Sequence, residues 1–296
     1  MTKFVTLLVQ GVAEGALYAL VAMGFVIIYK ANRVLNFAHG ALMLLGATVV
    51  AFTHDQLGFY GAAILGLVAT GLVATIFQYA VIQPVRGATP EVVTILTIGV
   101  DVILATALTN VLGTKLRVLG HPWGGSNVHL GSVSITVNQL IGLIVAAVLI
   151  AVFFIAFSRS SWGMSMRAAA EDPEAAALVG LRLNRIMASA WFVAGFLACV
   201  AGIFLTGAPA STLSSSLADL GLVALPAAII GGLTSIYGAL IGGLVIGVVA
   251  SLTTGYQDKL HFLGNGFGTV VPFILLLLVL LVRPEGLFAD KRGARV

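Results

Sequence analysis

Long apolar runs constrain this chain more than any other feature of its sequence. They cover residues 5–29, 37–52, 59–82, 92–112, 139–157, 186–205, 217–230, 236–253 and 269–282. A membrane-spanning helix needs about 20 mostly apolar residues, and the lack of polar alternation within the runs disfavours a transmembrane β-barrel. We therefore predict an all-α, polytopic transmembrane helix bundle of about eight to nine spans. The runs 37–52 and 217–230 are short and are expected to be broken or re-entrant.

The composition supports this interpretation and excludes several classes of protein. Of the 296 residues, 59% are hydrophobic and 9% are charged, whereas a soluble domain carries about 25% charged residues. A soluble enzyme, a disordered tail and a nucleic-acid-binding protein are therefore excluded. The single cysteine, Cys199, permits no intrachain disulfide, and the five histidines show no metal-ligand spacing. No lysine lies in a phosphate-binding loop, so we expect neither catalysis nor nucleotide binding by this chain.

Positively charged residues predict the orientation of the chain, which we treat as one permease domain over 1–296. Membrane proteins keep most of their short basic connections on the cytoplasmic side. The connections after the first, third and fifth runs and the chain end hold most of the basic residues: Lys30, Arg33, Arg86, Arg159, Arg167, Arg182, Arg185, Arg283, Lys291, Arg292 and Arg295. Nine spans would place the N-terminus outside and the C-terminus inside, whereas eight would place both inside. The first run is too long for a cleaved signal and is interpreted as a retained span.

Two connections are long enough to form elements of their own. The outer one, about 113–138, contains turn residues such as Gly120, Pro122, Gly124, Gly125 and Gly131, and its weakly alternating part, 128–136, suggests a short hairpin. Its Trp123 and His121 are either partner contacts or an interfacial aromatic and a surface histidine.

The inner connection, about 158–185, carries the signals of a short helix at both ends. Asp172 is a favoured N-cap, Pro173 suits the first helical position, and Glu174 complements the positive end of the helix dipole. Gly180 suits a left-handed stop. A helix of about two turns is marginal by itself, so we expect it to pack against a partner.

This helix resembles the EAA loop of ABC importer permeases, because Glu174-Ala175-Ala176 is followed after three residues by Gly180. Four further stretches resemble the branched-chain amino acid (Liv-type) permeases. They are Asn36-Phe37-Ala38-His39-Gly40, Pro84-Val85-Arg86, the glycine-rich segment 228–243, and Arg283-Pro284-Glu285-Gly286-Leu287-Phe288.

The resemblance implies a role and a set of partners. The coupling helix would dock into a cytoplasmic ATPase through Glu171, Asp172, Pro173, Glu174, Ala175, Ala176 and Gly180. Two ABC ATPase subunits would bind ATP and Mg, a second homologous permease would complete the pathway as a heterodimer, and an extracytoplasmic solute-binding protein would deliver the small-molecule substrate. No cofactor is expected in this chain. The location implied is the inner membrane of a bacterial cell, crossed several times.

The cargo implied is a branched-chain or hydrophobic amino acid, and alternatives remain open. Ala41 stands where many relatives carry an acid, which leaves urea, short amides or aromatic acids as substrates of the same machinery. A proton-coupled secondary transporter that uses Glu14 or Asp101 is a different class, and it would work without ATPases. A structural or sensory membrane subunit would bind ATPases without moving solute.

Polar residues inside apolar runs are the candidates for the translocation pathway. Glu14 and Asp101 lie within spans, where a carboxylate is costly unless it faces water or the bundle interior. Either carboxylate can instead hold helices together, and Asn36 and His39 either cap the helix that starts there or take part in gating. Close helix packing is expected at Gly238, Gly242, Gly243 and Gly247, which are spaced four apart in pairs.

Overall fold

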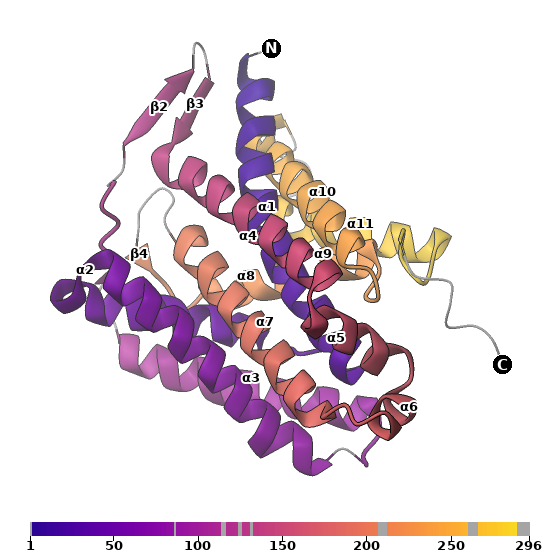
Figure 1. The fold of residues 1–296 in the computed structure, drawn as a ribbon. Helices are drawn as coiled ribbons and strands as arrows, with labels where there is room; N and C mark the ends of the chain where they lie inside the picture. Colours follow the sequence, from indigo (N-terminus) through magenta and orange to yellow (C-terminus); the bar gives the residue numbers. More distant parts are fainter. Residues whose placement is uncertain are drawn as a thin grey trace.

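The computed structural model describes residues 2–85, 87–113, 117–123, 126–130, 133–206, 212–259 and 266–288, which form a predominantly helical bundle (Figure 1). Arg86, Lys115, Gly124, Gly125, Gly131, Lys291, Arg292 and Arg295 lie outside these ranges. The longer helices are α1 (Thr2–Asn32), α2 (His39–Phe77), α3 (Pro90–Leu112), α4 (Val137–Arg159), α5 (Ser161–Glu171), α7 (Leu183–Leu205), α10 (Ile236–Gly255) and α11 (Phe267–Val282). The shorter ones are η1 (Gln78–Ile82), η2 (Gln83–Val85), α6 (Pro173–Leu178), α8 (Leu217–Val223), α9 (Leu225–Gly231) and η3 (Gln257–Lys259).

Six helical stretches in the described part of the chain are long and apolar enough to cross a membrane. Two shorter apolar helical stretches, Leu217–Gly231 and Phe267–Val282, fall below that length. The criterion therefore gives fewer spans than the eight to nine expected from the runs. The difference arises because α2 and its continuation to Val85 join two predicted runs in one element, and because the two shorter stretches are counted apart.

Helix α2 folds back on itself at Gly58. The backbone there has φ 67° and ψ 167°, a conformation that favours glycine because a side chain would clash. A Cβ placed on Gly66 would lie 3.1 Å from the carbonyl oxygen of Gly46, although 20 residues of straight helix would separate the two by about 30 Å. The two arms of α2, residues 39–57 and 59–77, therefore lie antiparallel in contact.

Helix α1 is the centre of the bundle, and its residues 15–28 are all buried. It packs mainly against α10 and α7, and close approach to α10 depends on glycine. A Cβ on Gly247 would lie 2.2 Å from the Cα of Gly15, and a Cβ on Gly243 would lie 2.4 Å from the backbone nitrogen of Ala19. Small residues let helix backbones approach within a membrane, where packing is the main force between helices.

Gly238 and Gly242 contact α9 in the same way. A Cβ on Gly238 would lie 2.0 Å from the carbonyl oxygen of Gly231, and one on Gly242 would lie 2.1 Å from that of Ala227. All four glycines assigned to packing from the sequence thus face a neighbouring backbone.

The run 217–230 is divided into α8 and α9 at Ala224. Pro226 lies in the first turn of α9, where its missing N–H is tolerated, and so it begins a new helix there. Helix α8 crosses the start of α2, because a Cβ on Gly221 would lie 2.4 Å from the Cα of Gly40. The break therefore positions α8 against the middle of the bundle.

The bundle has two distinct ends (Figure 1). The first, which we call the hairpin end, carries the N-terminus and the antiparallel hairpin of β2 (Asn127–Leu130) and β3 (Val133–Thr136). It also carries β1 (Arg117–Val118), which pairs with β4 (Thr212–Leu213). The second, which we call the α6 end, carries α5 and α6. The hairpin expected within 128–136 is present.

An aromatic cluster secures the loop that follows β1 at the hairpin end. The His121 ring lies 5.1 Å from the Phe59 ring, and Trp123 stacks with Phe204 at 6.1 Å between ring centroids. Burial lowers the pKa of His121 more than a backbone hydrogen bond at Ile203 raises it, and the neighbouring His54 lowers it further. His121 and Trp123 are thus half-buried and pack against other aromatic rings.

Candidate functional site

Helix α6 begins as the sequence predicts. The Asp172 carboxylate accepts hydrogen bonds from the backbone N–H groups of Glu174 at 3.0 Å and Ala175 at 2.9 Å. Pro173 occupies the first turn, where no intrahelical partner for its nitrogen is needed. The cap satisfies two of the N–H groups that every helix start leaves free.

Gly180 ends the helix in a left-handed conformation with φ 88°. Its N–H donates to the carbonyl of Ala177, and the N–H of Leu181 donates to that of Ala176, both at 3.0 Å. This pair of bonds is the Schellman motif, in which a glycine closes the last turn. Both ends of α6 are therefore fixed by local hydrogen bonds, although the helix has only six residues.

The surface of α6 is almost entirely exposed. Only Ala176 is buried, whereas Leu178 is 89% and Val179 78% exposed. Two aliphatic side chains at the tip of a short helix are an unusual surface feature, because apolar patches on proteins often mark interaction sites. Leu178 and Val179 were not singled out in the sequence, although two aliphatic residues directly before the stop glycine were the available signal.

Helix α5, which precedes α6, was not expected from the sequence. Its N-cap is Ser160, whose hydroxyl accepts a hydrogen bond from the N–H of Gly163 at 3.1 Å. Near its C-terminal end, the carbonyl of Ala170 accepts a hydrogen bond of 2.9 Å from the guanidinium of Arg33. Since Arg33 follows α1 directly, this bond joins the central helix to the α5–α6 segment.

The chain re-enters the bundle before α2 begins. His39, the first residue of α2, packs against Phe25 with 4.8 Å between ring centroids. Phe25 lies seven residues before the end of α1, which corresponds to about 10 Å along a helix. His39 is fully buried. The Asn36 side chain accepts a hydrogen bond from the N–H of Ala38 at 3.2 Å, within the turn before the helix.

Two residues of α3 hold this re-entrant turn in place. The hydroxyl of Thr97 accepts from the N–H of Phe37 at 3.1 Å, and Asp101 accepts from the N–H of Ala41 at 3.3 Å. Asp219, on α8, lies near enough to Asp101 for the two carboxylates to interact electrostatically. Asn36, His39 and Asp101, three of the four residues assigned to the pathway, are thereby brought together near the middle of the bundle.

Glu14, the fourth of these residues, lies apart from them and lines a cavity of about 240 Å³. We call it the Glu14 cavity. Its lining comes from α1, α8, α10 and α11: Leu7, Gln10, Glu14, Tyr18, Leu220, Val223, Ala250, Ser251, Thr254, Gly255, Gly268 and Thr269. The Glu14 carboxylate also interacts with the side chain of Gln139 on α4, and Gln10 approaches the carbonyl of Ser134 on β3 at 3.4 Å. The cavity thus lies toward the hairpin end.

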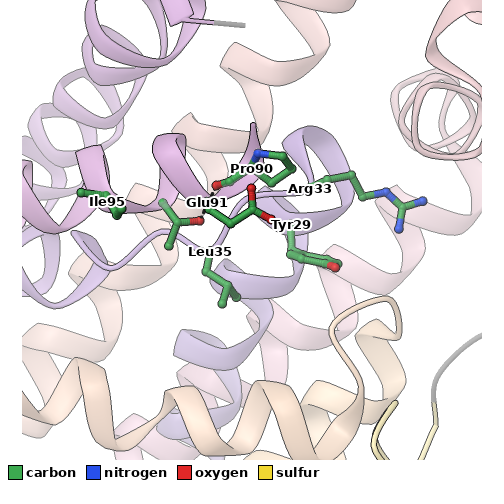
Figure 2. Close-up of a pocket in the computed structure, with 7 residues that line it drawn as sticks. Tyr29, Arg33, Leu35, Pro90, Glu91 and Ile95 are labelled. Atoms are coloured by element: carbon green, nitrogen blue, oxygen red, sulfur yellow. Dashed lines mark hydrogen bonds between the residues drawn. The ribbon is translucent and has the colours of Figure 1, made fainter. Parts of the chain in front are cut away.

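A second pocket, of about 420 Å³, lies at the other end of α1 (Figure 2). We call it the Arg33 pocket, and it is lined by Tyr29, Arg33, Leu35, Pro90, Glu91, Thr94 and Ile95. Figure 2 shows the Arg33 side chain extending away from Glu91, consistent with its hydrogen bond to α5. The two compartments therefore lie at opposite ends of one central helix. Within the described ranges, no group of three or more His, Cys, Asp or Glu residues is placed to hold a metal ion.

Comparisons with known proteins point to one family. The family model described as the permease component of the branched-chain amino acid transport system matches residues 7–280. The chain is 31% identical to LivH of Escherichia coli K12, a high-affinity branched-chain amino acid transport system permease protein, over 99% of this chain and 98% of LivH. BraD of Pseudomonas aeruginosa, named for the same transport activity, is 29% identical over 98% and 97%.

Among solved structures, PsaBC from Streptococcus pneumoniae in complex with Fab has a similar fold. Its TM-score is 0.51 at 15% identity, and the match covers 93% of this chain and 91% of that one. At this identity the likeness concerns the fold alone.

Proposed function

Because the chain belongs to the family of branched-chain amino acid transport permeases, we propose that it is the membrane subunit of an ABC importer for these amino acids. The observation that carries this proposal is α6, a capped helix whose aliphatic tip, Leu178 and Val179, is exposed. Separate ATPase subunits would bind ATP and Mg and would receive α6, so that ATP hydrolysis takes place outside this chain. The names of the relatives favour branched-chain amino acids over urea, short amides or aromatic acids as cargo.

The proposal places the α6 end in the cytoplasm and the hairpin end outside. The distribution of described basic residues supports this orientation, because arginines gather at the α6 end: Arg33, Arg159, Arg167, Arg182, Arg185 and Arg283. Nine spans fit this orientation if the two arms of α2 cross separately and α8 and α9 together make one broken crossing. The inner membrane of a bacterial cell is the location that this arrangement supports.

The partners follow from the same assignment. Two ATPases would bind one α6 each, so the complete importer needs a second permease, and we propose a homologous chain for that place. An extracytoplasmic solute-binding protein would deliver cargo at the hairpin end. Closure of the ATPases on ATP would move α6, and the bond from Arg33 to Ala170 would carry that movement to α1. Glu14, Asn36, His39 and Asp101 would face the route of the cargo.

A charge reversal on α6 tests the docking. We expect Glu174→Arg to abolish ATP-driven leucine uptake by the reconstituted importer and to prevent copurification of the ATPases. The matched control is Asp258→Arg, an exposed acid at the hairpin end, which should leave both unchanged. Normal uptake and normal copurification with Glu174→Arg would refute docking through α6. Leucine uptake by this chain alone under a proton gradient would instead identify a secondary transporter.

A further inference from the structure

The Glu14 cavity combines one carboxylate with hydroxyl and aliphatic groups. Its charge comes from Glu14, and hydroxyl groups come from Tyr18 and from the Ser and Thr residues of α10 and α11. Its aliphatic lining is Leu7, Leu220, Val223 and Ala250. A carboxylate inside a membrane protein is costly unless it meets water or a cation. Such a lining matches a small molecule that carries a primary ammonium group and a branched aliphatic side chain.

We propose that the Glu14 cavity is the outer binding site for the cargo, closed on its inner side by the contact between Phe25 and His39. Glu14 pairs there with the ammonium group, and the aliphatic lining holds the side chain. This inference rests on the proposed function, since the identity of the cargo and the orientation of the chain come from it.

The register of α1 connects the cavity to its closure. Leu7, Gln10, Glu14 and Tyr18 line the cavity at spacings of three and four residues, so they share one face of the helix. Phe25 lies seven residues beyond Tyr18, and Tyr29 lies eleven beyond it, which correspond to about two and three turns. The same face of α1 therefore carries the outer cavity, then Phe25, and then Tyr29 in the Arg33 pocket.

The closure is formed where the first residue of α2 meets the second half of α1. The ring of His39 packs against Gly24, because a Cβ placed on Gly24 would lie 2.4 Å from the Cε1 atom of His39. Just beyond it, α8 crosses α2 at Gly40 and Gly221, while Leu220 and Val223 of α8 line the Glu14 cavity. Phe25 and His39 are both buried, and Phe25 lies on α1 between Tyr18 of the Glu14 cavity and Tyr29 of the Arg33 pocket.

Buried polar atoms at the closure lack protein partners. Within the described residues, both ring nitrogens of His39 and the amide nitrogen of Asn36 make no hydrogen bond, although both residues are fully buried. Buried polar groups are normally satisfied, and an unsatisfied one is costly. A route that opens between Phe25 and His39 supplies these atoms with water or cargo, so the polar groups are suited to a passage that opens and closes.

Cysteine labelling tests the site without depending on transport rates. Cys199 is buried and is the single cysteine of the chain, so an added cysteine reports on its own position. In the reconstituted importer without ATP, Ala250→Cys should react with a membrane-impermeant maleimide added outside, and leucine should protect it. Reaction that leucine does not slow would refute the cargo site.

The charge of Glu14 is tested by substrate analogues. We expect Glu14→Gln to raise the KM for leucine at least tenfold and to remove leucine protection of the cysteine at position 250, because a partner of a charge pair is lost. Glu14→Asp should keep part of the affinity for leucine and part of the leucine protection. Glu285→Gln, at the α6 end, should change neither the KM nor the protection. The wild type should reject 4-methylpentanoate, which is leucine without its ammonium group. Glu14→Gln should discriminate less between leucine and 4-methylpentanoate. Equal KM values for wild type and Glu14→Gln would refute the pairing.

The closure is tested from the inner side. Thr94→Cys, in the Arg33 pocket, should react only with reagent added inside, and adding Phe25→Ala should make it reactive from outside as well. Phe153→Ala removes another buried ring, from α4, and should leave that sidedness intact. Unchanged sidedness with Phe25→Ala would refute the closure. The same vesicles report ATP-driven leucine uptake by the wild type, so loss of that uptake with normal labelling would contradict the proposed function and not the geometry of the closure.

Discussion

Leu178 should contribute strongly to ATPase binding and hardly at all to the stability of the permease. Full burial of a leucine side chain contributes about 1.5–3 kcal/mol, so docking of a side chain that is 89% exposed makes about 2 kcal/mol available. Since 1.4 kcal/mol corresponds to a factor of ten, Leu178→Ser should weaken ATPase binding about 30-fold. The free energy of unfolding should change by less than about 0.5 kcal/mol, because an exposed side chain makes few contacts.

The assay is the dissociation constant of the ATPase subunit for the permease in nanodiscs, measured beside the thermal midpoint of the permease. Leu57→Ser is the matched control, because Leu57 is 54% exposed at the hairpin end, away from α6. The reasoning fails if Leu178→Ser binds the ATPase as tightly as the wild type does. It also fails if Leu57→Ser weakens binding equally, since the effect would then reflect lost surface hydrophobicity in general.

The remaining predictions concern backbone fit and pH. Gly247→Ala should lower the stability of the bundle by about 1–3 kcal/mol, because the added Cβ meets the backbone of α1. Gly99→Ala is the control and should not lower the stability, because a Cβ at Gly99 has open space. Thermal unfolding of the two variants measures the difference. Gly180→Ala should cost about 1–2 kcal/mol at its left-handed position and reduce the uptake obtained per ATP hydrolysed. An unchanged ratio of uptake to ATP hydrolysed would contradict the role of the Schellman stop. Because the pKa of His121 lies below its ordinary value of about 6.5, protonation favours the unpacked loop, and its packing should weaken as pH falls below that value. Hydrogen exchange of residues 117–123 should therefore accelerate on acidification, and His121→Gln should remove the dependence.

Local signals in the sequence were sufficient for α6, because capping is determined by residues a few positions apart. Asp172 and Gly180 bond to the backbone of their own turn, so no knowledge of the rest of the fold is required. The apolar runs likewise located the long helices, since hydropathy acts residue by residue. By contrast, α5 is amphipathic and carries charges, so it gave no apolar run.

The arrangement of the runs depends on contacts between distant residues, which one sequence does not reveal. The reversal at Gly58 looks like any glycine in an apolar stretch until Gly46 and Gly66 are seen in contact. The candidate pathway shows the same limit. Asp101 and His39 were recognised as polar residues in apolar surroundings, but their association through α3 and the separation of Glu14 from them are tertiary features.

The burial of α1 on every side limits how this protein can change its cargo. Residues 15–28 already contact neighbours all around the helix, and Gly15 tolerates no larger side chain against α10. With the cargo site proposed above, new substrate preferences have to arise from the peripheral walls of the Glu14 cavity, on α8, α10 and α11. The sequence of the helix at the axis is thus closely constrained by its neighbours, whereas the residues on the surrounding helices are freer to diversify.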